Sequence, residues 1–191
     1  MSESGISAAR YKLDAGQSSF TVQAFAAGLL AGLGHNPSFA IRDFSGEVLF
    51  APTTLADASL RLVINANSLT LLDEVKQKDR QEIEQTMFNE VLEIARYPEI
   101  VFQSTQIAPT RITEGRYKLR IIGDLTLHGV TRPGLWLLAQ LTLDGDTLRA
   151  QGDFTLKQTD YKIKLVSVAA GALKLKDELK FTFDLAGYRE A

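Results

Sequence analysis

The sequence predicts an all-β protein, an eight-stranded antiparallel barrel with one long helix packed against it. Apolar and polar residues alternate with a period of two over most of the 191-residue chain, as in strands with one face in a core. About eight such segments follow one another closely, which favours antiparallel neighbours joined by short turns. One segment has helical periodicity instead. Eight antiparallel strands can close on themselves and so remove the exposed edges of the sheet.

The amino-terminal half of the chain contains four alternating segments. The expected strands cover residues 20–24, 39–50, 58–64 and 99–107. The phase of the alternation slips by one residue between Ile41 and Phe44, which predicts a β-bulge around Arg42 and Asp43.

The carboxyl-terminal half repeats one strand design four times. The expected strands cover residues 117–127, 135–143, 148–156 and 179–185. Turn signals separate them at residues 129–134, which include Pro133, and at the Asp-Gly-Asp sequence of residues 144–146.

The helical segment covers residues 73–97, where Asp73 suits the amino-terminal cap and Pro98 ends the helix. Its apolar stripe recurs at steps of three and four and consists of Ile83, Met87, Val91, Ile94 and Ala95. This stripe must lie against the barrel wall or across its mouth. The other face of the helix is highly charged, as in a solvated face or, alternatively, a partner surface.

Composition excludes several classes of function. The chain has 21 Lys and Arg and 23 Asp and Glu, so no overall basic field favours nucleic acid. It has no cysteine, and it is long enough to bury a core without disulfides as one domain over residues 1–191. The amino terminus lacks the apolar stretch of a secretory signal, and the apolar patch at residues 24–34 is too short for a bilayer. We therefore expect a cytoplasmic protein with no membrane span.

The chain offers no local reaction centre. The common nucleophile, zinc and phosphate-binding motifs are absent, so we expect no catalytic residue and no metal. Acid–base chemistry stays conceivable if one of the two histidines, His35 or His128, pairs in space with a carboxylate. The candidate carboxylates are Asp43 and Asp124. The plainer interpretation makes His128 a surface or strand-end residue and His35 a turn residue bonded to backbone.

Several inward positions carry small residues, namely Ala24, Gly46, Ala58, Gly123, Ala139, Ala150 and Gly152. These small side chains occupy less of the barrel interior, which predicts tunnel space beside the phenylalanines of neighbouring strands. An apolar tunnel with few polar groups suits a long hydrocarbon chain. Plain core packing is the alternative, because every closed barrel needs apolar residues inside.

Four segments resemble the YceI-like family, a lipocalin-like family named for polyisoprenoid binding. The most specific is GDLTLHGVTRP at residues 123–133, supported by YKLDAGQSSF at 11–20, ARYPEIVFQST at 95–105 and KLKDELKFTFDL at 174–185. The resemblance runs from about residue 11 to 188. It implies a lipocalin-like barrel that holds an isoprenoid tail in its lumen, commonly as a homodimer, without catalysis. The chain departs from the family at Gln17 (usually His), Gln158 (usually Arg) and Tyr161-Lys162 (usually Phe-Gly).

The leading hypothesis is a non-catalytic carrier that sequesters a polyisoprenoid, an isoprenoid quinone or a similar long-chain lipid in the lumen. No other cofactor is expected. Its tunnel-lining residues are taken from the inward faces of the strands: Phe20, Val22, Phe39, Ile41, Leu62, Phe102, Leu119, Ile121, Phe154 and Phe181. His35 and Arg42 are the candidates for the head group at the mouth, since a guanidinium donates in a fixed fork to phosphate or carbonyl oxygens.

Two other functions stay open. One is a metal-free hydrolase or isomerase that uses His35 or His128 at the barrel rim. The other is a filled barrel that acts as a protein-interaction module through the charged face of the helix.

Overall fold

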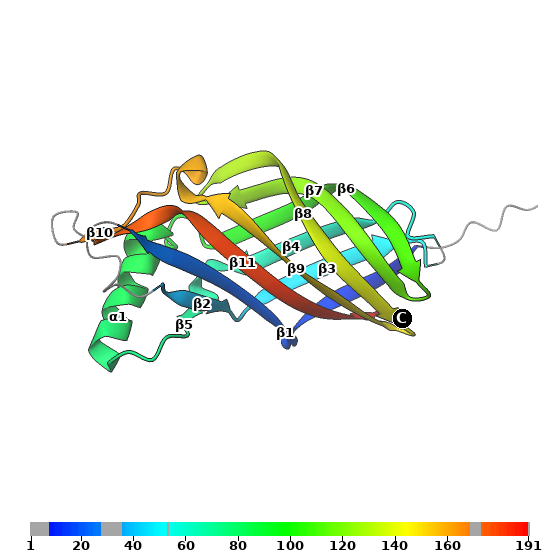
Figure 1. The fold of residues 1–191 in the computed structure, drawn as a ribbon, viewed down its shortest axis with the longest axis horizontal. Helices are drawn as coiled ribbons and strands as arrows, with labels where there is room; N and C mark the ends of the chain where they lie inside the picture. Colours follow the sequence, from blue (N-terminus) through cyan, green and yellow to red (C-terminus); the bar gives the residue numbers. More distant parts are fainter. Residues whose placement is uncertain (1–7, 28–35, 53, 169–172, 191) are drawn as a thin grey trace, which may run out of the picture.

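Most of the described residues belong to a single antiparallel sheet, which is accompanied by short helical segments and loops (Figure 1). The structure is a computed structural model that describes residues 8–27, 36–52, 54–168 and 173–190. Its strands are β1 (Ala9–Ala27), β2 (Ser38–Ile41), β3 (Phe44–Phe50), β4 (Ser59–Asn65), β5 (Leu69–Leu71), β6 (Glu99–Thr113), β7 (Arg116–Leu127), β8 (Val130–Asp144), β9 (Thr147–Lys157), β10 (Ser167–Val168) and β11 (Leu173–Arg189). Its helical segments are α1 (Gln77–Thr86), η1 (Ala66–Ser68), η2 (Met87–Val91) and η3 (Gln158–Tyr161).

Eight of these strands close into a barrel. Their order around the ring is β1, β3, β4, β6, β7, β8, β9 and β11, and the pairing of β11 with β1 completes the circle. Every pairing in the described part of the chain is antiparallel. The predicted eight-stranded antiparallel barrel is therefore confirmed. The short strands β2, β5 and β10 lengthen the sheet at one end (Figure 1).

The irregularity predicted as a bulge at Arg42 and Asp43 is a break between two strands. β2 ends at Ile41 and pairs with β1 and β5, whereas β3 begins at Phe44 and pairs with β4 and the start of β1. The Asp43 carbonyl accepts a hydrogen bond from the backbone of Asn65 (3.1 Å). The slip in phase thus marks the point where the chain changes its partner strand.

The β7–β8 connection is a two-residue hairpin rather than the turn predicted over residues 129–134. Its central residues, His128 and Gly129, both have positive φ (51° and 69°), as in a type I′ turn whose twist matches that of the strands. The rest of the expected turn lies inside β8, where Pro133 and Gly134 stand opposite Asp124 as a register shift. A proline is tolerated there because a bulge interrupts the ladder of hydrogen bonds.

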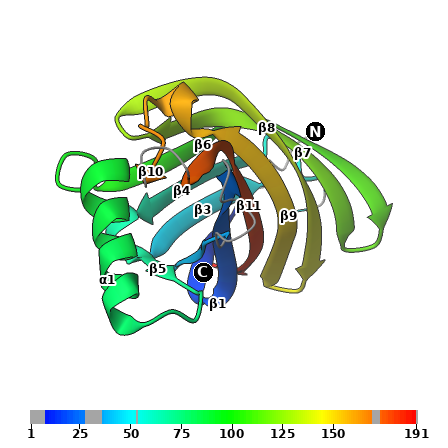
Figure 2. The same cartoon turned by 60° about the vertical axis from the view of Figure 1, so that its left-hand side comes forward.

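The helix is shorter than the predicted 73–97. Asp73 does not cap it, because its carboxylate accepts a hydrogen bond from the Ser38 backbone (2.8 Å). Helical geometry begins after Lys76, continues through η2, and ends before Glu93, which has a positive φ of 46°. The apolar stripe is confirmed for Ile83, Met87 and Val91, which pack on the core. Ile94 and Ala95 lie beyond the end of the helix, and Ala95 is exposed, so this part of the predicted stripe is wrong. Figure 2 shows α1 beside β5 at one end of the barrel.

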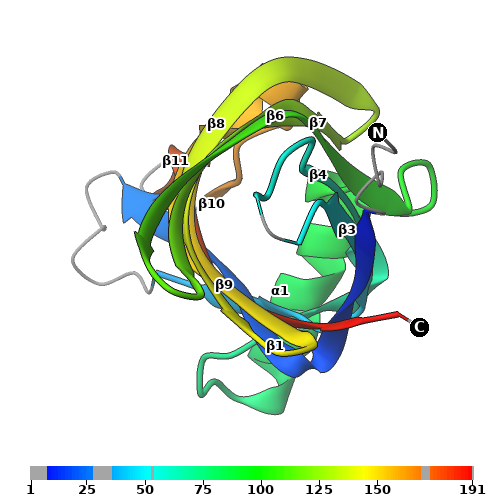
Figure 3. The same ribbon diagram turned by 90° about the vertical axis from the view of Figure 1, so that its right-hand side faces the viewer.

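The opposite end of the barrel is occupied by the described residues of the β3–β4 loop, 51–52 and 54–58. Figure 3, which looks along the barrel from that end, shows this loop reaching across the opening. Leu55 inserts from it and is 2% exposed, and its φ of 55° is unusual for a leucine. At the end of β3, Phe50 is equally buried and stacks on Tyr11 with ring centroids 4.9 Å apart. Burying one such side chain contributes about 1.5–3 kcal/mol to folding.

Candidate ligand-binding site

An apolar cavity of about 60 Å³ lies inside the barrel toward the end that the β3–β4 loop covers. All of its lining residues are apolar, and every one of the eight barrel strands contributes at least one. They are Leu13, Val48, Phe50, Leu55, Ala58, Leu60, Ile107, Leu119, Ile121, Leu141, Leu148, Ala150 and Leu185. The alternation of inward and outward residues along each strand places them there.

A cluster of phenylalanines occupies the lumen beside β1, β9 and β11. Phe154 and Phe181 are stacked, with ring centroids 4.8 Å apart and planes 5° from parallel. Phe20 meets Phe181 and Phe183 edge to face at 6.3 Å, and it meets Phe44 at 6.2 Å. Rings packed in this way leave little free volume between them.

The small inward residues leave less tunnel than predicted. A Cβ added at Gly123 would lie 2.4 Å from the Phe102 ring, and one at Gly152 would lie 2.6 Å from the Phe183 ring. At Gly46 the space is taken by Leu13, at 2.4 Å. At these three glycines the prediction of open space is wrong, because a large side chain from a neighbouring strand fills the gap. Of the small residues, Ala58 and Ala150 do line the cavity.

The residues predicted to line the tunnel lie in the interior but not around one void. Leu119 and Ile121 line the cavity, and Phe20, Phe154 and Phe181 belong to the phenylalanine cluster. The other five are buried in the same core without lining that cavity: Val22, Phe39, Ile41, Leu62 and Phe102.

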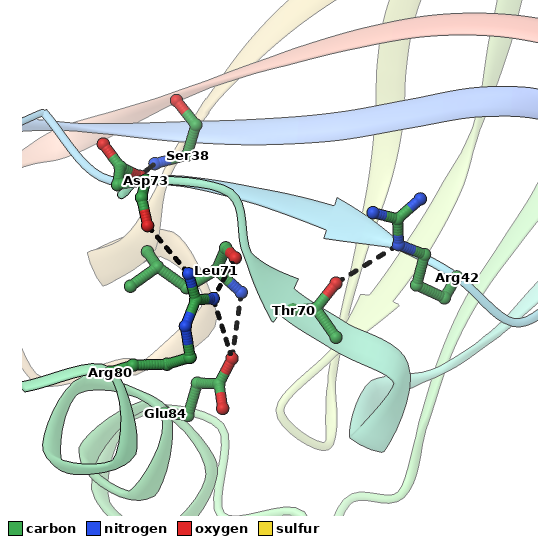
Figure 4. A network of polar contacts seen from close by, with 7 residues as sticks. All are labelled: Ser38, Arg42, Thr70, Leu71, Asp73, Arg80 and Glu84. Atoms are coloured by element: carbon green, nitrogen blue, oxygen red, sulfur yellow. Dashed lines mark hydrogen bonds and ion pairs between the residues drawn. The ribbon is translucent and has the colours of Figure 1, made fainter. Parts of the chain in front are cut away.

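Of the two residues predicted to bind a head group, only Arg42 lies in the described part of the structure. His35 lies outside the described residues. Arg42 is exposed between β2 and β3, and its Nε donates a hydrogen bond to the Thr70 hydroxyl (3.2 Å; Figure 4). Its recognition of a head group stays a prediction.

A larger groove, of about 700 Å³, opens on the surface near the β7–β8 turn. It lies between the end of η2, that turn and the segment after η3, and its lining mixes charged and apolar residues: Asn89, Glu90, Glu93, His128, Thr159, Lys162, Ile163, Lys164 and Leu165. Sequence analysis did not find this groove. One available signal was the His128-Gly129 pair, which fits a two-residue hairpin between alternating segments.

His128 ties three segments together at the groove. Its Nε2 lies 2.6 Å from a carboxylate oxygen of Glu93, and its Nδ1 lies 3.2 Å from the carbonyl oxygen of Tyr161. Each ring nitrogen of His128 thus faces an acceptor oxygen from a different segment. The hydrogen bond from His128 is the main reason that the pKa of Glu93 is lowered. The carboxylate partner of His128 is therefore Glu93 and not Asp43 or Asp124, the two candidates named from the sequence. The side chain is 10% exposed, so His128 is not a surface residue, but it directly follows the end of β7, as the strand-end interpretation predicted.

Backbone strain is concentrated in the same place. Glu93, His128 and Lys162 all have positive φ, between 46° and 59°. Glycine reaches this region of backbone conformation without strain, whereas these three residues each carry a side chain. With both ring nitrogens engaged, His128 offers no free acceptor atom for a substrate proton, so the groove as built favours holding segments together.

Within the described part of the chain, no three side chains among the histidines, aspartates and glutamates are grouped so that they could hold a metal ion. No helix within residues 8–27, 36–52, 54–168 and 173–190 is long and apolar enough to cross a membrane.

The closed eight-stranded antiparallel barrel with an apolar lumen defines the fold class of the protein. The YceI-like domain family matches residues 11–186, and the chain belongs to this family. Relatives include a UPF0312 protein of Vibrio parahaemolyticus, 31% identical over 90 residues, and one of Enterobacter sp., 32% identical over 105 residues. These matches cover 47% and 55% of the chain but only 42% and 48% of the relatives, less than half of their length.

Solved structures share the fold at low identity. BcnA of Burkholderia cenocepacia has a TM-score of 0.70 and 20% identity, over 91% of this chain and 98% of that one. A polyisoprenoid binding domain from Saccharophagus degradans has a TM-score of 0.67 and 16% identity, over 94% and 98%. These likenesses establish the architecture of the barrel.

Proposed function

We propose that this protein binds one apolar chain inside its barrel and thereby sequesters a polyisoprenoid or a similar long-chain lipid, without chemical conversion. The observation that carries the proposal is the cavity wall, to which all eight barrel strands contribute apolar residues only. Such a wall offers nothing to a polar molecule, and it gains about 0.8 kcal/mol for each methylene removed from water. The similarity to a polyisoprenoid binding domain supports the same class of guest.

The volume of the cavity sets a condition on this function. Sites for drug-sized ligands measure about 300–1,000 Å³, whereas this cavity measures about 60 Å³. A long chain therefore enters only if the phenylalanine cluster moves aside. The stacked pair Phe154 and Phe181 is the most suitable part to move, because both rings are only half-buried.

The same small volume favours a second function, in which the barrel is a filled scaffold and an outer surface binds another protein. The two functions differ in what the lumen of the purified protein contains. Organic extraction of protein purified from its native source, followed by mass spectrometry, separates them. We expect a long-chain apolar compound in near-stoichiometric amount. Extracts without any such compound would contradict the carrier proposal.

Two variants make the test specific for the lumen. Ala150→Leu adds apolar volume to the cavity wall and should lower the amount of guest recovered while the barrel still folds. Thr182→Leu makes a comparable change on the outer face of the neighbouring strand β11, where the side chain is exposed, and should leave recovery unchanged. Equal recovery from both variants would place the extracted lipid outside the cavity.

A further inference from the structure

An exposed apolar patch lies on the outer wall of the barrel. Trp136 and Leu138, two residues apart on β8, are 64% and 57% exposed. Their side chains share one face because strand residues alternate, and the half-buried Ile122 on β7 stands directly opposite Trp136. The face that a barrel turns to water usually carries polar residues, so large apolar side chains gathered there indicate a contact surface.

A row of bases runs beside this patch. Arg116, Lys118 and Arg120 are exposed at alternate positions of β7, and Arg120 stands opposite Leu138. Among the described residues, none of the three bases lies within 4 Å of a carboxylate oxygen. Their charges are therefore available to a partner.

The surroundings of the patch contain few competing acids. In the strand register, residues that face one another across β6, β7 and β8 form rows. Three successive rows contain no acidic residue: Thr110, Lys118 and Gln140; Ala108, Arg120 and Leu138; Gln106, Ile122 and Trp136. On β9 the acid nearest to Leu138 is Asp153, which is paired with Lys180 at 3.6 Å. The local charge is positive although the whole chain has a formal net charge of -2.

We propose that the Trp136 patch, defined as Ile122, Trp136 and Leu138 with Arg116, Lys118 and Arg120, docks the protein onto an anionic lipid bilayer. Tryptophan is favoured at the boundary between head groups and acyl chains, where its ring is apolar and its N–H meets water. Bases beside it are attracted to anionic head groups. A second copy of the chain fits less well, since it would bring another basic row toward this one.

The patch also adjoins a seam in the wall. The ladder between β8 and β9 ends at the pair Leu138–Asp153, although β9 continues to Lys157. Next along β9 is Phe154, one of the stacked rings of the lumen. A docked bilayer would therefore lie beside the point where the β8–β9 ladder stops. The docking proposal rests on the surface residues and does not depend on a guest in the lumen.

The chain contains a single tryptophan, so its fluorescence reports on this patch alone. We expect the emission of Trp136 to shift to the blue with phosphatidylglycerol vesicles and to be quenched by brominated acyl chains. Phosphatidylcholine vesicles should produce neither effect, and 0.5 M NaCl should weaken binding to phosphatidylglycerol. Absence of a response to phosphatidylglycerol vesicles would overturn the proposal.

Charge-matched variants test the basic row. Neutralising two bases of the patch, as in Lys118→Gln with Arg120→Gln, should weaken vesicle binding roughly thirtyfold. The control, Lys174→Gln with Lys176→Gln, makes the same change in net charge with two exposed lysines of β11 and should bind as the wild type does. An equal loss of vesicle binding in both double variants would contradict the role of the patch. The proposal would also be contradicted if the protein formed a dimer without vesicles and iodide could not quench Trp136 in that dimer, because the patch would then bind a second copy of the chain.

Discussion

The imidazole of His128 and the carboxylate of Glu93 are 2.6 Å apart, and they join the β7–β8 turn to the segment that follows the helix. Arg96 also donates to Glu93, at 3.3 Å, and the ring of Tyr97 covers His128 with centroids 4.6 Å apart. This contact is the polar anchor of the end of the barrel that carries the helix.

The stability of the fold should fall in acid partly through Glu93. Its pKa is lowered from 4.5 in the folded protein, mainly by the hydrogen bond from His128. The stabilisation is therefore present above about pH 4.5, the unfolded value, and is lost as the pH falls through the lower folded value. Melting temperatures of Glu93→Gln should be lower than wild type at pH 7 and converge with it in acid. Glu90→Gln, a neighbour in the groove, is the control, and a constant difference across the pH range would contradict this assignment.

The turn glycine of the β7–β8 hairpin should be intolerant of a side chain. Gly129 has a φ of 69°, and a Cβ there would lie 2.4 Å from the Tyr97 ring. Gly129→Ala should lower the free energy of unfolding by about 3 kcal/mol, from strain and overpacking together. Gly134→Ala isolates the strain, because its φ is 78° but nothing lies within 4 Å of the new Cβ. Equal losses in urea titrations of the two variants would show that Tyr97 does not matter.

Two neighbouring inward positions of β9 should respond in opposite directions to added volume. Gly152→Ala drives a Cβ into the Leu138 carbonyl oxygen at 2.4 Å and should destabilise the barrel by about 1–3 kcal/mol. Ala150→Val extends into the cavity and should be neutral or stabilising by up to about 1 kcal/mol. Chemical denaturation measures both. A destabilised Ala150→Val protein would mean that the cavity does not accept even two methyl groups.

The helix should loosen from the barrel when Arg80 is removed. The Arg80 guanidinium donates to the carbonyl oxygens of Leu71 and of Asp73, the latter at 2.8 Å, and Glu84 accepts from the Leu71 backbone at 3.1 Å (Figure 4). Arg80→Ala leaves two carbonyls without this donor and should destabilise by about 1–3 kcal/mol. Hydrogen exchange should speed up at the amide of Leu71. Lys78→Ala, exposed on the same helix, should stay within about 0.5 kcal/mol of wild type.

The strands were predictable because a barrel wall has water on one side and core on the other. Each expected alternating segment lies within an observed strand or extends beyond it by one residue, except residues 39–50, which are divided between β2 and β3. The hairpin turn at residues 145–146 was also predictable from the sequence, because glycine suits the positive φ that such a turn requires. In the structure, Gly145 has a φ of 55°. The ends of the helix were harder to predict, because a residue that suits a helix cap can instead bond a residue far away in the sequence. Asp73 has the chemistry of a helix cap, yet its carboxylate bonds Ser38, which only the folded chain brings near.

The filling of the lumen could not be predicted from one strand at a time. Gly123 and Gly152 are small, but whether a small residue leaves a void depends on the side chain that faces it from another strand. Phe102 and Phe183 occupy those spaces. The partner of His128 was equally hidden, because Glu93 is 35 residues away and reaches it only through the tertiary fold.

By itself the sequence determined the barrel, the antiparallel pairing of its strands and its membership of the YceI-like family, because local alternation and turn residues act through neighbours along the chain. The tertiary structure alone decided how much of the lumen is open and which residue holds His128. It also brought Trp136 together with the bases of β7. Volume, ion pairing and surface patches each depend on side chains from different strands, and their distances are set only when the sheet closes.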